Sequence, residues 1–305
     1  MHSILLLLLG ILLAPLFSGL VLKIKAFFGG RKGSPILINY YTLIKLLRKG
    51  SVYSTSTTYL FKLGPMVSLV AVIVILLFLP VAGHTAVFSF DGDIVVLLYL
   101  FGLARFLTIA AAMDTASPFE GMGAAREAYF PIFCEAALFM ILILFYLLTG
   151  ALSLAEHFAN NQPMVLWQTV GATLLFVVAS LFIVLLTENS RVPVDDPATH
   201  LELSMIHEVM ILDHSGPDLA FIELGASLKL FFYSALITLL ICPFWFGHAL
   251  FDGLLFFGVL TLVYVAVGIT ESVMARFRMD KVPMFGLASF ALAFFAAVVS
   301  LQVMK

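Results

Sequence analysis

Charged residues are scarce in this sequence of 305 residues. Asp, Glu, Lys and Arg make up 11% of it and hydrophobic residues 62%, whereas charged residues make up about 25% of an average soluble domain. So small a polar share cannot cover a folded domain of this length in water. The composition excludes an ordinary soluble protein and indicates one that crosses a membrane many times.

Cysteine is also rare. Cys134 and Cys242 are the two in the chain, and each lies in an apolar run without a second cysteine at metal-binding spacing. We therefore expect this chain to hold no iron–sulfur cluster, haem or zinc. The sequence also lacks a nucleophile elbow, a phosphate-binding loop and a dinucleotide fingerprint. It gives no catalytic residue for bond chemistry.

Long apolar runs are abundant instead, and a helix of about 20 apolar residues crosses the hydrocarbon core of a bilayer. Such runs exclude the alternating pattern of a membrane barrel. The predicted fold is all-α, a polytopic protein with about eight transmembrane helices in a single transmembrane domain over residues 1–305. The expected spans are 4–22, 61–81, 93–113, 131–150, 165–187, 225–246, 250–273 and 282–303.

A basic segment follows the first span. Its second half, ILINYYTLIKLLRKG, carries apolar residues at helical spacing around Lys45, Arg48 and Lys49. This pattern predicts an amphipathic helix that lies at the membrane interface. A solvated basic loop is the alternative.

The connections between spans alternate in charge. The odd-numbered connections carry nearly all the Lys and Arg, whereas the second, fourth and sixth carry none. By the positive-inside rule the odd connections are cytoplasmic and both termini lie outside. The fifth connection, 187–224, is dense in acidic residues and histidine, and we expect it to be a cytoplasmic functional loop.

Charges within or beside spans cost about 2.5–3.5 kcal/mol each on insertion scales and tend to mark ion or proton paths. Glu135, in FPIFCEAALFM, lies a turn or so into an expected span, and burial there favours a group that exchanges protons near neutral pH. Pairing with Arg126, simply to dock two helices, is the alternative. The candidates of this kind are Arg105, Asp114, Glu120, Arg126, Glu127, Glu135, Glu188, Glu202, Glu223 and Glu271.

Within the fifth connection, the run 198–212 has helical periodicity, so Pro197 is expected to begin a helix that Asp196 caps. His200, His207 and His214 recur every seven residues. On a helix that spacing separates neighbours by about 10 Å along the axis, too far for one zinc ion. We therefore expect no metal site.

The stretch ENSRVPVDDPATHLELSMIHEVMILDHSG resembles the signature loop of NADH dehydrogenase subunit 1, the membrane subunit of respiratory complex I. Matching positions include Glu188, Arg191 and Asp195. Three further stretches are more similar to the membrane subunits of formate hydrogenlyase and hydrogenase-4. They are LYLFGLARFLTIAAAMDTASPFEGMGAAREA, ESVMARFRMD and RKGSPILINYYTLIKLLRKG. Val194, Ala198 and His200 depart from the complex I pattern and favour the hydrogenase branch.

The resemblance implies an eight-helix membrane subunit that anchors a peripheral redox arm and couples it to ion translocation. The proton path it implies comprises Glu135, Glu188, Glu202, Asp114, Asp195, Asp213, Arg126 and Arg191. The residues expected at the redox-arm interface are Arg31, His207, Glu208 and Glu223.

The partners that it implies are hydrogenase-like large and small subunits, a ferredoxin-like iron–sulfur subunit and antiporter-like membrane subunits, with membrane lipid and no nucleic acid. Iron–sulfur clusters and a nickel–iron site are expected in those partner subunits. The chain itself is expected in the cytoplasmic (inner) membrane of a prokaryote. One alternative is the quinone-site subunit of an NADH dehydrogenase, with a chamber between the first span, the amphipathic helix and the sixth span. A purely structural membrane anchor is another, and a standalone transporter is disfavoured because no internal repeat is visible.

Overall fold

The computed structural model describes residues 2–158, 162–196, 205–242 and 245–303, which form helices and connecting loops without a strand. In these ranges eight helical segments are long and apolar enough to cross a membrane, so the predicted all-α fold is confirmed. The helices are α1 (His2–Phe28), α2 (Ile38–Leu47), α3 (Tyr59–Leu77), η1 (Val81–Gly83), α4 (Asp93–Asp114), α5 (Pro118–Tyr129), α6 (Ile132–Thr149), α7 (Leu154–His157), α8 (Gln162–Glu188), α9 (His207–Met210), α10 (Pro217–Ile241), α11 (Ala249–Val273), η2 (Met279–Lys281) and α12 (Val282–Val303).

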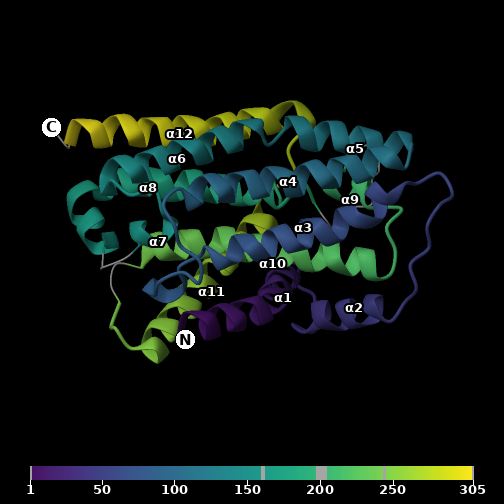
Figure 1. Ribbon diagram of the computed structural model, residues 1–305, viewed down its shortest axis with the longest axis horizontal. Helices are drawn as coiled ribbons and strands as arrows, with labels where there is room; N and C mark the ends of the chain where they lie inside the picture. Colours follow the sequence, from purple (N-terminus) through teal and green to yellow (C-terminus); the bar gives the residue numbers. More distant parts are fainter. Residues whose placement is uncertain (1, 159–161, 197–204, 243–244, 304–305) are drawn as a thin grey trace.

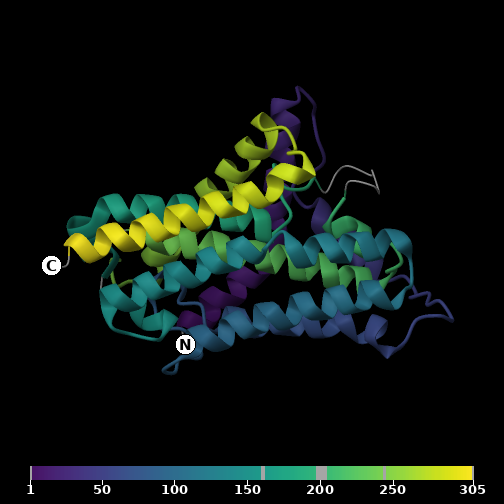
Figure 2. The same cartoon turned by 90° about the horizontal axis from the view of Figure 1, so that it is seen from above.

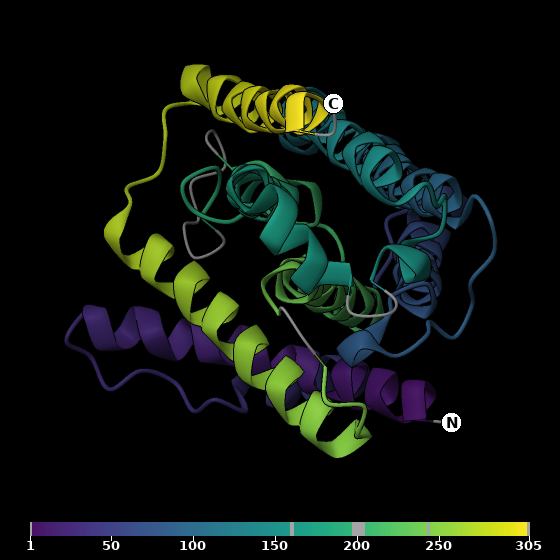
Figure 3. The same cartoon turned by 90° about the vertical axis from the view of Figure 1, so that its left-hand side faces the viewer.

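Helix α10 is the axis of the bundle. It is the most buried of the spans and packs against α1, α3, α8 and α11; Figure 3 shows it from the end of the bundle, enclosed by its neighbours. Helix α4 lies along α3, and α12 lies along α6 and α8 (Figure 1). Figure 2 shows α1 and α11 leaning away from the remaining helices. Because α8 and α10 are surrounded on several sides, polar groups on their facing surfaces are shielded from lipid.

Both chain ends lie at one end of the bundle, and α2, α5 and α9 lie at the opposite end (Figure 1). The basic connections are therefore gathered at the end away from the termini, as the alternation of charge along the sequence predicts.

Local sequence signals account for several helix ends. The side chain of Thr58 caps α3 by accepting a hydrogen bond from the Leu60 amide, which satisfies one of the free N–H groups of the first turn. Pro118 and Pro217 occupy the first turns of α5 and α10, where a missing N–H costs nothing. Gly150 ends α6 in the left-handed conformation, which glycine adopts without strain.

The amphipathic segment does form a helix, α2, and none of its residues is buried within the chain. It is fastened along α1, because Asn39 donates a hydrogen bond to the Pro15 carbonyl at 3.1 Å and the Tyr40 hydroxyl donates to the Leu12 carbonyl. At Gly19 the backbone of Ile36 comes so close that a Cβ atom would collide with its carbonyl oxygen. The segment before α2 therefore packs directly on the backbone of α1.

Two expectations about the fifth connection were wrong in their boundaries. The sixth span begins at Pro217 rather than at Gly225, so Glu223 is part of a membrane helix and the connection runs from 189 to 216. In its described part, the helix expected over 198–212 is reduced to the single turn of α9, because Met205 and Ile206 are not helical. Residues 197–204 lie outside the described ranges. The Ile206 and His207 amides donate to the side chain of Asp195 in place of helical hydrogen bonds.

The fourth span also begins earlier than the sequence predicts. It comprises α5 and α6, which meet at Pro131, and together they run from Pro118 to Thr149. The expected span omitted α5 because its sequence, PFEGMGAAREAY, is less hydrophobic than that of α6.

Candidate functional site

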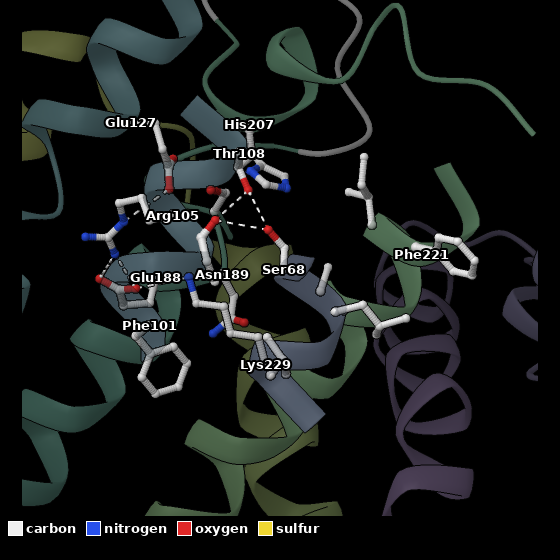
Figure 4. A pocket seen from close by; sticks show the side chains of 17 residues that line it. Ser68, Phe101, Arg105, Thr108, Glu127, Glu188, Asn189, His207, Phe221 and Lys229 are labelled. Atoms are coloured by element: carbon white, nitrogen blue, oxygen red, sulfur yellow. Dashed lines mark hydrogen bonds and ion pairs between the residues drawn. The ribbon is translucent and has the colours of Figure 1, made fainter. Parts of the chain in front are cut away.

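Arg105 of α4 lies at the centre of a cluster of carboxylates inside the bundle. Its Nη2 atom lies 2.6 Å from both carboxylate oxygens of Glu188, and its Nη1 donates to Glu135. Its Nε atom lies 3.8 Å from Glu127. One guanidinium thus joins the ends of α5, α6 and α8, and Figure 4 shows it turned toward Glu188 and Glu127. A planar guanidinium is suited to this role because its donors point in several fixed directions.

A second cation reaches Glu188 from the other side. Lys229, on the central helix α10, places its Nζ atom 3.0 Å from Oε2 of Glu188. The Glu188 side chain is 4% exposed, so its charge is compensated by protein groups rather than by water. We call Arg105, Lys229, Glu127, Glu135 and Glu188 the Arg105 cluster.

The Arg105 cluster separates two cavities. The first opens among α3, α4, α8 and α10 and is lined by Ser68, Thr108, Glu127, Glu188, His207 and Lys229 (Figure 4). We call it the inner cavity. The second lies beside α4 and α6 and is lined by Tyr99, Arg105, Glu135, Phe139, Glu188 and Tyr233. Glu135 is the most exposed carboxylate of the cluster, with 48% of its side chain accessible. The cluster therefore offers one face to the inner cavity and the other to the side of the bundle.

A further cavity adjoins the first. It lies between α1, α2, α10 and the fifth connection, and it shares Asn189, Ser190 and His207 with the inner cavity. Glu208 and Glu223 contribute to its lining. Three of the predicted residues, His207, Glu208 and Glu223, therefore lie together around one hollow next to the Arg105 cluster.

A separate group of charges holds the fifth connection to α1 and α11. Glu271, whose side chain is 0% exposed, lies 3.0 Å from Lys25 and 3.4 Å from Arg191. Lys25 also lies 3.5 Å from Asp196, so Asp196 takes part in an ion pair. The helix start at Pro197 that Asp196 was expected to cap lies outside the described residues. We call Lys25, Arg191, Asp196 and Glu271 the Glu271 cluster.

Asp195 organises the backbone of the same connection. It is 1% exposed, lies 2.8 Å from Arg276, and accepts hydrogen bonds from the Ile206 and His207 amides at 2.9 and 3.2 Å. Charge-assisted hydrogen bonds of this kind fix the position of the buried carboxylate. Asp195 thus lies beside the cavity next to the inner cavity, where it holds the backbone of the fifth connection in place.

The other predicted residues lie apart from the Arg105 cluster. Asp114 accepts hydrogen bonds from the Thr58 amide and hydroxyl at 2.6 and 3.0 Å, at the start of α3. The Asp213 amide donates to the buried Glu120. Arg126 donates to the Met205 carbonyl, and the cation that pairs with Glu135 is Arg105. Arg31 lies exposed just after α1, and Glu202 falls outside the described residues.

His214 is buried in the fifth connection and stacks on Phe61 with ring centroids 4.0 Å apart. Burial lowers the pKa of His214, against the opposing influence of Asp218 and Asp213. The imidazole is therefore neutral at neutral pH, in a loop outside the spans.

Sequence reasoning missed parts of both clusters. Arg105, Glu127 and Glu271 stand out in the sequence as charges in or near spans, but their roles as partners do not. Lys229 was missed altogether, although a lysine within the apolar run LGASLKLFFYSALI is itself a signal. Among the described residues no group of three His, Cys, Asp or Glu side chains is arranged to hold a metal ion.

Comparison with known proteins gives consistent results. The NADH dehydrogenase family model matches residues 1–302. The chain is 30% identical over 274 residues to hydrogenase-4 component C of Escherichia coli K12, covering 88% of this chain and 85% of that protein. It is 30% identical over 300 residues to formate hydrogenlyase subunit 4 of the same organism, covering 93% of each.

More distant relatives include NADH-ubiquinone oxidoreductase chain 1 of Triticum aestivum, 28% identical over 243 residues, covering 73% of this chain and 69% of that protein. Among solved structures, a chain of the membrane-bound sulfane sulfur reductase (MBS), an archaeal respiratory membrane complex, has the same fold. Its TM-score is 0.82 at 19% identity, with 98% of both chains covered.

Proposed function

The chain belongs to the NADH dehydrogenase family, and from that premise we propose that it anchors a peripheral redox arm and carries protons in a complex I-like energy-converting oxidoreductase. The relatives at 30% identity are a hydrogenase-4 component and a formate hydrogenlyase subunit, which favours the hydrogenase type. The redox metals then belong to the hydrogenase-like and ferredoxin-like partner subunits, and this chain supplies the membrane part.

The observation that carries the proton role is the charge balance of the Arg105 cluster. Three carboxylates, Glu127, Glu135 and Glu188, face two cations, Arg105 and Lys229. With every group ionised the cluster has one excess negative charge, and one added proton neutralises it. Because uncompensated charge is costly in a low-dielectric interior, the cluster is suited to take up one proton and release it again.

The proton path that we propose enters through the inner cavity, passes the Arg105 cluster and leaves toward Glu135. The entrance is surrounded by His207, Glu208 and Glu223, at the end of the bundle that carries α9 (Figure 1). We place the redox arm at this end, on the cytoplasmic side of a prokaryotic inner membrane, with Arg31 and the fifth connection at the interface and both termini outside. Antiporter-like membrane subunits would receive the proton beyond Glu135.

One observation supports the quinone-site alternative. The cavity between α1, α2 and α10 occupies the position where a chamber for a quinone would have to lie, with Ser18, Leu22 and Asn39 in its lining. Its other lining groups include the charged Arg191, Asp195, Glu208 and Glu223, which suit water better than an isoprenoid tail. Binding of a quinone analogue to the purified complex would favour this alternative.

The first experiment is to purify the chain from native membranes in mild detergent, identify its partners and assay hydrogen evolution. Co-purification of a nickel–iron large subunit with activity supports the hydrogenase type. A flavin-dependent NADH module among the partners would assign the chain to complex I. Isolation without partners would contradict both the hydrogenase type and complex I.

The proton role is tested with Glu135→Gln in the reconstituted complex. We expect normal assembly and loss of proton translocation, because the variant removes the half-exposed carboxylate that faces the side of the bundle. Retained translocation at normal assembly contradicts the proposal and favours the structural-anchor alternative, in which the carboxylates serve only to dock helices.

A further inference from the structure

Lys229 combines three features within the Arg105 cluster. It is the cluster's one member on the central helix α10, it lines the inner cavity, and its Nζ atom lies 3.0 Å from Glu188. The side chain is 21% exposed, against 4% for Glu188. Lys229 therefore lies between the inner cavity and the most buried carboxylate of the cluster.

The two cations on Glu188 differ in their chemistry. A guanidinium keeps its proton at any physiological pH, whereas a lysine ammonium can give one up and regain it. Arg105 contacts both oxygens of Glu188 at 2.6 Å, so it can fix the geometry but cannot deliver a proton. Of the two, Lys229 alone can do so.

We propose that Lys229 is the residue that loads Glu188 with a proton from the inner cavity. The proposal rests on the proposed proton role of the chain and deepens it, since it names the donor and the direction of entry.

The transfer conserves atoms and charge. One N–H bond of the Lys229 ammonium breaks and an O–H bond forms on Oε2 of Glu188, so that an ion pair becomes a neutral pair without net charge entering the site. The Lys229 amine then takes up an excess proton that arrives through the inner cavity as a hydronium ion, which leaves behind a neutral water molecule. The cluster has gained one proton and is neutral, and the proton on Glu188 can pass on toward Glu135 on the other side of Arg105.

The groups that face Lys229 agree with this direction. Glu188 approaches it from α8, and the inner cavity brings Glu127 from α5, Arg105 from α4 and His207 from α9 to the same space. Two carboxylates and one guanidinium therefore surround the inner-cavity side of Lys229. The side chain of Lys229 thus connects the inner cavity to Glu188, as the proposed direction of transfer requires.

The test is Lys229→Arg in the assembled complex, reconstituted into vesicles that contain a pH-sensitive dye. A cation at position 229 is retained, but it cannot release a proton. Positioned acid–base groups contribute about 10²–10⁴-fold to proton transfer, so we expect proton translocation to fall by at least about 100-fold. Assembly and dye-linked activity of the redox arm should stay at the wild-type level, because neither needs the transfer.

Lys25→Arg is the matched control. Lys25 also lies 3.0 Å from a buried glutamate, but in the Glu271 cluster, where we assign no proton transfer, so translocation should be retained. Lys229→His and Lys229→Gln complete the set: the imidazole can carry a proton and should restore part of the rate that glutamine loses. If Lys229→Arg fails to assemble, equal rates in the His and Gln variants overturn the proposal.

Failure of this inference is distinct from failure of the proposed function. Normal translocation in Lys229→Arg together with its loss in Glu188→Gln overturns the role of Lys229 and leaves the proton path standing. Normal translocation in Lys229→Arg, Glu188→Gln and Glu135→Gln alike overturns both.

Discussion

At the scale of single residues, Arg105 is the group on which the interior depends most. It neutralises carboxylates from three helices, and removal of one partner from a buried ion pair leaves the others uncompensated. We expect Arg105→Gln to lower the free energy of unfolding by about 3–5 kcal/mol. Thermal denaturation of the purified protein in detergent measures the change.

Arg278→Gln is the appropriate comparison for this variant. Arg278 pairs with Asp280 at 3.3 Å, but the two side chains are 81% and 60% exposed, and exposed pairs contribute about 0–1 kcal/mol. A similar loss of stability in both variants would contradict the central role of Arg105.

A second residue-scale prediction concerns pH. Burial lowers the pKa of His157 from 6.5 to about 4, and the residue lies in α7, outside the spans. Between these two values the unfolded chain binds a proton that the folded chain does not, so stability falls as the pH drops through this window. We expect a loss of up to about 3 kcal/mol by pH 4.

Denaturation temperatures between pH 7 and about 4 test this, with His157→Gln expected to show a weaker dependence on pH. His248→Gln removes an exposed histidine directly before α11 and serves as the control. An unchanged pH profile in His157→Gln would show that other groups are responsible.

The sequence identified the charges of the site better than their pairing. Glu135 and Glu188 stand out because a carboxylate among apolar residues is costly. Their common partner, Arg105, is 30 residues from one and 83 from the other, and no periodic pattern connects residues at such separations. Pairing follows from how helices pack, so Arg126 was an equally reasonable partner for Glu135 until the fold was known.

At the scale of elements, the membrane spans were predictable because the bilayer fixes their length. The polar residues at the ends of the spans could not be assigned in this way. Helix α10 begins eight residues before the expected start, and its first turns contain Asp218 and Glu223, which resemble loop residues in the sequence. The Gly216-Pro217 pair marks the true start, since proline favours the first turn of a helix. Short helices such as α9 depend on tertiary bonds to Asp195 and leave no periodic pattern.

The packing of α2 on α1 gives a prediction at this scale. Gly19→Val places a branched side chain where the Ile36 carbonyl lies, and overpacking of this kind costs about 1–3 kcal/mol. We expect faster hydrogen exchange across Ile38–Leu47 and unchanged exchange in α12. Gly258→Val, at a helical glycine with open space around it, should leave α2 as it is; equal effects of the two variants would contradict a close contact at Gly19.

At the scale of the whole molecule, the distribution of basic residues predicts the orientation in the membrane. Both termini lie at the end of the bundle opposite to α2 and α9 (Figure 1). Alkaline phosphatase fused after Lys305 should be active, because it folds outside the cytoplasm, and the same enzyme fused after Lys49 should be inactive. The reverse pattern would invert the predicted topology and move the proposed redox-arm site to the other side.

The spacing of the two charge clusters limits where the chain can change length. Glu188 belongs to the Arg105 cluster and Arg191 to the Glu271 cluster, so two residues of backbone join a site inside the bundle to one at its rim. An insertion or deletion between them must pull a charged side chain out of one cluster. Among natural variants of this chain, gaps in the fifth connection should therefore fall after Asp196, and the stretch from Glu188 to Asp196 should keep a constant length.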